Sequence, residues 1–203
     1  MQSLIIFAKL PRPGEVKTRL GHGLGMHEAS AVYERLAQQT FSLGDQLLSQ
    51  GLRVYLFYDP RATEQEMRSW IGHPFEFAQQ VGETLGERMR AAFEKTFADG
   101  SGRTVIVGTD IPDLTVDVIV RAFNLLSAHN VVLGPSSDGG YYLLGMTRLV
   151  NELFEGLAWS TSAVYQETLD RIAALDLSHA VLGELADIDT EEDYKRYLER
   201  VSP

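Results

Sequence analysis

Four positive side chains lie close together near the start of the chain, in a segment with two prolines and a glycine. The cations are Lys9, Arg12, Lys17 and Arg19. Prolines stiffen a loop, and a glycine such as Gly14 permits a turn or a close approach of the backbone to a ligand. This loop, including Arg12 and Gly14, is therefore a candidate phosphate-binding segment. The alternative is a solvated loop whose cations pair with acidic side chains elsewhere.

Asp110 ends the stretch RTVIVGTD, whose apolar residues do not alternate with polar ones, as in buried parallel strands. Pro112 then prevents the backbone from continuing in a central ladder. A carboxylate at the carboxyl end of a strand is well placed to hold a hard cation through its oxygens. Asp110 or Asp113 could instead be a turn or cap residue, which is a common use of aspartate.

Asp138 precedes two glycines in the stretch GPSSDGGYYLLG, which predicts a tight turn with unusual backbone dihedrals. Ser136 and Ser137 lie beside it and could contact a substrate. The same pattern also occurs in ordinary aspartate-glycine hairpins that have no function. Asp138 is therefore a candidate site residue with a structural alternative.

A second acidic stretch, LADIDTEEDY, lies near the end of the chain. Its acids are Asp187, Asp189, Glu191, Glu192 and Asp193. An acidic first turn stabilises a helix through its dipole, and the spacing of Asp189 and Glu192 fits a capping box. Five carboxylates are more than one cap requires, however. A divalent cation would relieve their repulsion.

The composition excludes several classes of function. The chain has 18 Lys and Arg against 28 Asp and Glu, a net charge of −10, whereas a protein that binds duplex nucleic acid needs an extended basic face. The local positive cluster therefore suits a small anion. Cys is absent, which excludes disulfides, thiolate metal sites and Cys nucleophiles. We find no membrane span or signal peptide in the sequence and expect a cytoplasmic protein.

Alternating strands and helices are expected to position these residues. Strands are predicted at residues 3–9, 53–59, 75–80, 103–110, 130–135 and 141–146. Helices are predicted at residues 26–50, 62–71, 84–100, 114–129, 160–175 and 190–201, with Ser160 as one N-cap. The glycines of GHGLG, residues 21–25, predict a turn before the first long helix, because their spacing is not that of a dinucleotide fingerprint.

This alternation predicts an α/β fold, a three-layer α/β/α sandwich around a mostly parallel sheet. No repeat or flexible linker divides the chain, so we expect a single domain over residues 1–203. In open α/β sheets, ligands bind outside the carboxyl ends of the strands. All four chemically unusual stretches fall at such ends.

Five motifs, in order, resemble a known family. They are FAK-x-P-x-PG-x-VKTRL, G-x-D-x-P-x-L, V-x-GP-x-x-DGGYYL-x-G, W-S-T and DIDT-x-x-D, between about residue 4 and residue 195. The pattern is similar to bacterial glycosyltransferase A-type transferases of the nucleotide-diphospho-sugar transferase superfamily. Relatives of that fold include phospholactate guanylyltransferase and the molybdenum-cofactor nucleotidyltransferases. The resemblance implies the nucleotide-diphospho-sugar transferase (glycosyltransferase A) fold.

The resemblance also implies a metal site. In such folds a carboxylate after a central strand and a second one near the C-terminal helix hold Mg²⁺ (or Mn²⁺). Here the matching residues are Asp110 and Asp189, with Asp187 as a rival for the second position. The paired D-x-D of many glycosyltransferases is absent, because Asp113 is displaced from Asp110.

Phosphate contacts are implied in the same way. The KTRL portion resembles the K-S-R-L of the guanylyltransferases, which directs Lys17 and Arg19 toward phosphates. Lys9 matches the lysine at the end of the first strand. The G-x-G-x-R loop of the sugar nucleotidyltransferases is absent, so the type of donor stays open.

These expectations combine into a Mg²⁺-dependent transferase with a nucleoside triphosphate or nucleotide-sugar donor and a small-molecule acceptor. In the first version, an acceptor anion or hydroxyl attacks the α-phosphorus, pyrophosphate leaves, and the cations Lys9, Lys17 and Arg19 neutralise developing charge. In the second, a nucleoside diphosphate leaves. Asp138 would contact or deprotonate the acceptor. The alternative is a non-catalytic nucleotide-binding or regulatory module that retains the fold.

Overall fold

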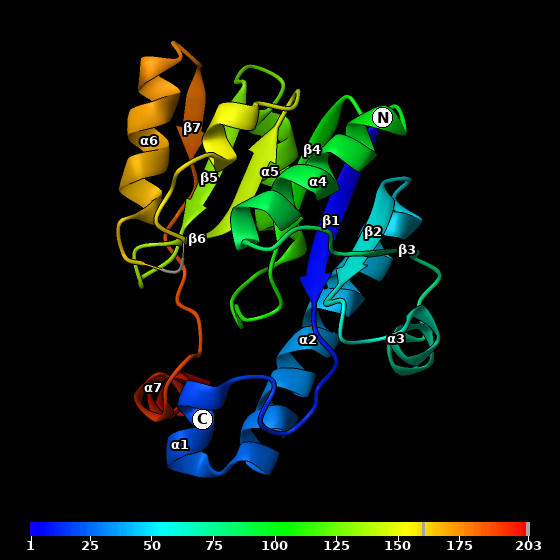
Figure 1. Ribbon diagram of the computed structural model, residues 1–203, viewed down its shortest axis with the longest axis vertical. Coiled ribbons are helices and arrows are strands. Elements are labelled where there is room, and N and C mark those ends of the chain that lie inside the picture. The colour runs from blue at the N-terminus through cyan, green and yellow to red at the C-terminus, as the bar shows by residue number, and fades with distance from the viewer. Residues whose placement is uncertain (160, 202–203) are drawn as a thin grey trace.

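One seven-stranded sheet organises the chain (Figure 1). The computed structural model describes residues 1–159 and 161–201. Its strands are β1 (Gln2–Ala8), β2 (Arg53–Tyr58), β3 (Glu76–Gln79), β4 (Arg103–Val107), β5 (Val131–Pro135), β6 (Tyr141–Met146) and β7 (His179–Val181). The strand order is β3-β2-β1-β4-β6-β5-β7.

All strand pairings are parallel except those of β6, which runs antiparallel to both β4 and β5. The reversal has a local cause. Only five residues, 136–140, connect β5 to β6, and a parallel crossover needs a dozen or more. The predicted mostly parallel sheet is confirmed, and so is the additional strand after the SSDGG turn.

Helices cover both faces of the sheet. They are α1 (Thr18–Leu24), α2 (Met26–Ser49), α3 (Glu64–Ile71), α4 (Leu85–Ala98), α5 (Val116–Leu125), the 3₁₀ helix η1 (Asn151–Phe154), α6 (Val164–Ala174) and α7 (Glu191–Val201). Successive strand residues point to opposite faces. Leu4 and Ile6 accordingly pack into one core with α2, α3 and α5, whereas Ile5 packs into another with α4, η1 and α6. The three-layer prediction is confirmed.

The first and last helices meet at the end of the molecule toward which β1 points (Figure 1). A small third core joins Leu20 of α1 to Val32 and Leu36 of α2, to Ile188, and to the partly buried Tyr194 of α7. This core brings the segment before α7 against the start of α1. No helix in the described part of the chain has the length and apolar character of a membrane span.

The GHGLG segment was predicted as a turn, and that prediction is wrong, because residues 18–24 form α1. Two of its glycines serve close packing. A Cβ on Gly21 would collide with the Met26 side chain, and one on Gly23 would collide with Glu191 of α7. The turn itself is confined to Gly25, which has a φ of 88°. The predicted cap Ser160 lies outside the described residues.

The cap of α7 also differs from the predicted one. Thr190, not Asp189, immediately precedes the helix, and its Oγ1 accepts from the backbone N–H of Asp193 at 3.2 Å. The Asp193 carboxylate in turn accepts from the backbone N–H groups of Thr190, at 2.8 Å, and Asp189, at 3.2 Å. This reciprocal pair is a capping box shifted by one residue from the predicted one. The side chain of Asp189 is therefore available for other contacts.

A substitution pair tests this assignment. Thr190→Ala removes the cap and should lower the free energy of unfolding by about 1 kcal/mol. Glu192→Gln is the matched control, because Glu192 belongs to the predicted capping box but not to the observed one. Through the helix dipole alone, this substitution should change the free energy of unfolding by less than about 0.5 kcal/mol. Urea denaturation followed by circular dichroism measures both. A larger loss for the Glu192 variant would contradict the shifted cap.

Candidate active site

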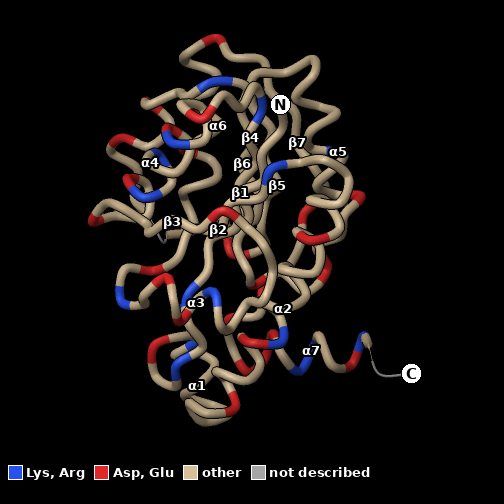
Figure 2. Tube along the Cα trace, turned by 90° about the vertical axis from the view of Figure 1, so that its right-hand side faces the viewer, with Lys and Arg blue, Asp and Glu red and all other residues tan. Residues whose placement is uncertain are grey.

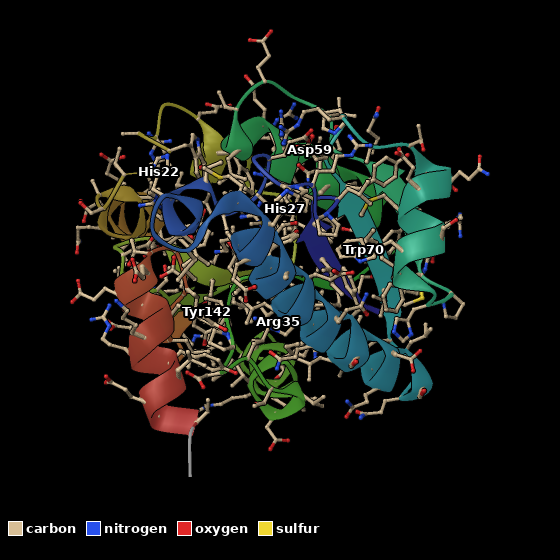
Figure 3. All side chains as sticks on the ribbon, turned by 90° about the horizontal axis from the view of Figure 1, so that it is seen from below. His22, His27, Arg35, Asp59, Trp70 and Tyr142 are labelled. Carbon is tan, nitrogen blue, oxygen red and sulfur yellow. The ribbon has the colours of Figure 1, made fainter. Side chains whose placement is uncertain are left out.

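A cleft of about 780 Å³ opens at the carboxyl ends of the central strands. Its walls come from the end of β1, the start of α1, the beginning of α4, the segment after β4, the β5–β6 turn, and the segment before α7. Figure 3 looks onto this end of the molecule, with α1, α2 and α7 toward the viewer. A second, more open hollow of about 520 Å³ lies between Leu10 and Trp70 and contains none of the predicted site residues.

Lys17 lies at the centre of the charged groups in this cleft. Its Nζ is 2.9 Å from Oδ2 of Asp110 and 2.8 Å from Oδ1 of Asp189, and only 4% of the side chain is exposed. Burial by itself would lower the pKa of Lys17, but Asp110 and Asp189 together raise it above its ordinary value. Lys17 is therefore a charged, buried ammonium held between two carboxylates from distant parts of the sequence.

The backbone delivers Lys17 to this position in an unusual conformation. Lys17 has φ 46° and ψ 44°, the left-handed region, and forms the N-cap of α1. A non-glycine residue in this region is strained, by about 1–3 kcal/mol, and such residues cluster at functional sites. Val16, directly before it, is buried in the core, and the carbonyl of Lys17 accepts from the backbone N–H of Gly21 at 2.8 Å. These anchors fix the backbone and leave the side chain to turn inward.

The other predicted cations divide into two groups. Arg19 is 69% exposed, lines the cleft and pairs with the second carboxylate oxygen of Asp189. Lys9 also lines the cleft. Arg12 does not, because its guanidinium pairs with Glu66 of α3 at 2.6 Å. Gly14, with a φ of 82°, also lies away from the cleft and shapes the loop.

Asp138 lines the opposite side of the cleft, in the β5–β6 turn. Its Oδ1 accepts from the Ser136 hydroxyl at 2.5 Å and from the backbone N–H of Gly140 at 2.9 Å. Gly139 has a φ of 88°, and a Cβ there would collide with the backbone of Ser162. The turn is thus packed tightly against the segment before α6, which fixes the direction of Asp138.

Asp187 takes part in none of the described ion pairs, although Lys17 lies within electrostatic reach of it. Burial raises its pKa to about 6, and repulsion from Asp189 and from Asp138 adds to the effect. The repulsion shows that the acids of the β5–β6 turn and of the segment before α7 lie within electrostatic reach of one another. Ionised Asp187 is costly here, and a further cation would stabilise it.

The predicted metal ligands suit Mg²⁺ or Mn²⁺ in their chemistry, because all are carboxylates. Asp110 and Asp189 both contact Lys17, and Asp187 lies two residues before Asp189 in the sequence. Within the described residues, however, no three His, Cys, Asp or Glu side chains gather closely enough to form a metal site. The three predicted acids therefore do not make one ready coordination group, although Asp110 with Asp189 or Asp187 could supply two ligands.

Sequence reasoning missed several residues at the same edge of the sheet. Asp59 (Figure 3) directly follows β2, much as Asp110 follows β4, and it is 5% exposed. Its carboxylate pairs with Arg61 at 2.8 Å and with Arg88 at 3.7 Å. Gln80 and Arg88 line the cleft on this side. The rule that singled out Asp110 applies equally to Asp59 and could have found it.

Tyr33 of α2 was also missed, although it positions two predicted segments. Its hydroxyl oxygen accepts from the backbone N–H of Lys9 at 2.8 Å and from the hydroxyl of Thr109 at 3.1 Å. Burial, and next the charge of Asp110, raise the pKa of Tyr33 above its ordinary value. Tyr33 therefore stays neutral and links the exit of β1 to the residue before Asp110.

Comparison with protein families and curated proteins gives one match. The family model described as "Uncharacterized protein conserved in bacteria (DUF2064)" matches residues 42–161. No curated protein matches the chain.

Solved structures agree on the fold. A protein from Desulfovibrio desulfuricans G20, named provisionally as a nucleotide-diphospho-sugar transferase, is 33% identical, with a TM-score of 0.89 over 99% of this chain and 89% of that chain. A nucleotidyl transferase from Methanothermobacter is 14% identical, with a TM-score of 0.64 over 98% and 97% of the two chains. The predicted nucleotide-diphospho-sugar transferase-like fold is confirmed.

A further structure is that of Rv0371c from Mycobacterium tuberculosis H37Rv in complex with manganese. It is 15% identical, with a TM-score of 0.59 over 98% of each chain. At this level of identity it and the Methanothermobacter protein show a shared fold alone.

The raised pKa of Asp187 predicts a pH effect on stability. Because the folded-state pKa, about 6, lies above the ordinary value of 3.8, the stability that protonated Asp187 contributes is fully present below the ordinary value. It is lost as the pH rises through about 6. The free energy of unfolding of the unmodified protein should therefore fall, relative to that of Asp187→Asn, between about pH 4 and pH 7.

Urea denaturation at a series of pH values, with EDTA present to remove metal, measures this difference. Asp138→Asn is a useful companion variant, because it removes one source of repulsion on Asp187. In this variant the decrease in the free energy of unfolding should occur at lower pH. Parallel curves for the unmodified protein and Asp187→Asn would mean that Asp187 ionises normally.

Proposed function

The chain belongs to the bacterial protein family DUF2064, and on that premise we propose that it is a Mg²⁺- or Mn²⁺-assisted transferase that uses a nucleotide donor. The observation that carries the proposal is the convergence, in one cleft, of Lys17 and Arg19 with Asp110 and Asp189. The fold shared with a protein provisionally named as a nucleotide-diphospho-sugar transferase supports the class of donor.

The donor phosphates bind, in this proposal, where the cations lie. Lys9 and Arg88 line the cleft on the side of β1, and Lys17 and Arg19 reach it from α1. An acidic protein would otherwise repel a polyphosphate, so these side chains supply the local positive potential. Arg19 is the most accessible of the predicted phosphate contacts because its side chain is largely exposed.

Asp110, with Asp189 or Asp187, would hold the metal ion. When bound there, the ion supplies positive charge to the phosphate oxygens and to the leaving group. Lys17 and Arg19 then stabilise the charge that develops on the leaving pyrophosphate or nucleoside diphosphate.

The side of the cleft nearest β5 favours a hydroxyl acceptor over an anion. Among the described residues of the β5–β6 turn and the segment before α6 that line the cleft, Ser136, Asp138, Trp159, Thr161 and Ser162, none is a cation. A phosphate or carboxylate acceptor would meet the carboxylate of Asp138 there, with Asp187 within electrostatic reach of it. Hydroxyl groups can instead bond to carboxylates and serines, and Trp159 offers an apolar face to a sugar ring.

Asp138 is placed to receive the acceptor's proton. As the acceptor oxygen forms its new bond, its O–H proton passes to the Asp138 carboxylate, which Ser136 and the backbone of Gly140 hold in place. With a triphosphate donor, the new bond is to the α-phosphorus and pyrophosphate leaves. With a nucleotide-sugar, the bond is to the anomeric carbon and a nucleoside diphosphate leaves.

A product assay distinguishes these versions. A thermal-shift screen of nucleoside triphosphates and nucleotide-sugars, with and without Mg²⁺, first identifies the nucleotide that stabilises the protein. Incubation of that nucleotide with a pool of hydroxylated metabolites then releases pyrophosphate in nucleotidyl transfer or nucleoside diphosphate in glycosyl transfer. Tight binding with neither product would favour the non-catalytic module.

Arg19→Ala tests the phosphate contact. Loss of one charged donor should weaken binding of the selected Mg²⁺–nucleotide by at least about tenfold in calorimetry. Arg12→Ala is the matched control, since Arg12 precedes α1 in the same N-terminal segment but pairs with Glu66 outside the cleft. Equal affinity for the Arg19 variant and the unmodified protein would remove the phosphate assignment.

Asp138→Asn tests the acceptor base. Product release should fall by about 10²-fold or more, because the amide cannot take the proton, while nucleotide affinity stays close to that of the unmodified protein. Equal losses of nucleotide binding and turnover would instead assign Asp138 to the donor site.

A further inference from the structure

The ammonium of Lys17 occupies the space between the two carboxylates that the proposed metal ion would use. Nζ lies 2.9 Å from Asp110 and 2.8 Å from Asp189, on one oxygen of each. With 4% of its side chain exposed, Lys17 is not a mobile surface group that meets these acids by chance. The two carboxylates thus already share a counter-ion that belongs to the chain.

A divalent cation bound to the same two carboxylates would lie very close to this ammonium. Metal–oxygen distances for Mg²⁺ and Ca²⁺ are about 2.0–2.6 Å, so a cation on the same carboxylate oxygens would stand within about 5 Å of Nζ. At that separation the repulsion between like charges amounts to several kcal/mol at the effective dielectric of a partly buried site. Both cations cannot be held there favourably at once.

We propose, on the basis of the function proposed above, that Lys17 competes with the divalent cation for Asp110 and Asp189 and yields only when nucleotide phosphates enter. The phosphates give the ammonium new oxygen partners in the same cleft, so leaving the carboxylates no longer strands a buried charge. Metal and nucleotide therefore bind with positive coupling, and each raises the affinity for the other.

The local structure suits such an exchange. The backbone of Lys17 is fixed at the start of α1 by the buried Val16 and by the Gly21 hydrogen bond, so only the side chain needs to rotate. Arg19 pairs with the other oxygen of Asp189 and keeps that carboxylate in place when Lys17 departs. Asp187 lies two residues before Asp189 and adds a third carboxylate to the lining of the same cleft.

Manganese binding to the full-length protein without any nucleotide tests the competition directly. Mn²⁺ alone is titrated, and free Mn²⁺ is followed by electron paramagnetic resonance. Lys17→Met, which removes the ammonium but keeps much of the apolar stem, should bind Mn²⁺ at least about tenfold more tightly than the unmodified protein. In the double variant Lys17→Met, Asp110→Asn, this gain should disappear.

Lys9→Met is the matched control. Lys9 lines the same cleft, but its ammonium is in no described ion pair with Asp110 or Asp189. Its loss should change Mn²⁺ affinity less than about threefold, the small effect of one more distant charge. Circular dichroism melting checks that each variant folds, and Lys17→Gln replaces the methionine variant if that one does not.

Unchanged or weaker Mn²⁺ binding in the folded Lys17 variant would overturn the proposal, as would an equal gain in Lys9→Met. The titration contains no nucleotide, so its outcome is independent of whether the protein is a transferase. Failure of nucleotide binding in calorimetry would remove the proposed function while the competition between Lys17 and Mn²⁺ still stood.

Discussion

A buried ammonium between two carboxylates is the interaction on which the site depends. Lys17 bonds to Asp189, 172 residues later in the sequence, and to Asp110 at the end of a central strand. A buried lysine without a partner would lose its charge or unfold its surroundings, and removal of one member of a buried ion pair typically costs about 3–5 kcal/mol. The trio therefore fixes the start of α1, the exit of β4 and the approach to α7 relative to one another.

The sheet explains why such distant residues meet. Parallel strands present their carboxyl ends at one edge, which places Lys9, Asp59 and Asp110 side by side along the order β2-β1-β4. The short hairpin from β5 to β6 then returns Asp138 to the same edge. Tyr33 ties two of these exits together through Lys9 and Thr109. The site is thus a consequence of strand order, with α1 and α7 closing it from outside.

Apolar periodicity in the sequence was sufficient to predict the layers and most elements, because buried strands and amphipathic helices carry their own pattern. Periodicity was insufficient for residues whose conformation or partner depends on tertiary contacts. Gly21 and Gly23 look like turn residues, yet they allow α1 to pack against Met26 and Glu191.

The cap of α7 is a second example. Asp189 and Thr190 both fit the spacing of an N-cap, but the side chain of Asp189 pairs with Lys17, and Thr190 caps the helix. Arg12 likewise shares a loop with Lys17 but has Glu66 within reach.

The distribution of charge completes the argument about function. Lys and Arg are scattered among Asp and Glu along the trace in Figure 2, so that view shows no extended basic face. Inside the cleft, charged side chains of both signs lie close together. Lys9 follows β1 and lines the cleft with Arg88 and Glu83, Asp138 lines it from the β5–β6 turn and Asp187 from the segment before α7, and Lys17 contacts Asp110. In the proposed function, the cations near β1 would attract the polyphosphate of the donor and the carboxylates of Asp138 and Asp187 would repel it, which would orient the donor with its reactive end toward the acids. Such orientation needs no contact with the base or the sugar, which suits a fold that accepts many donors.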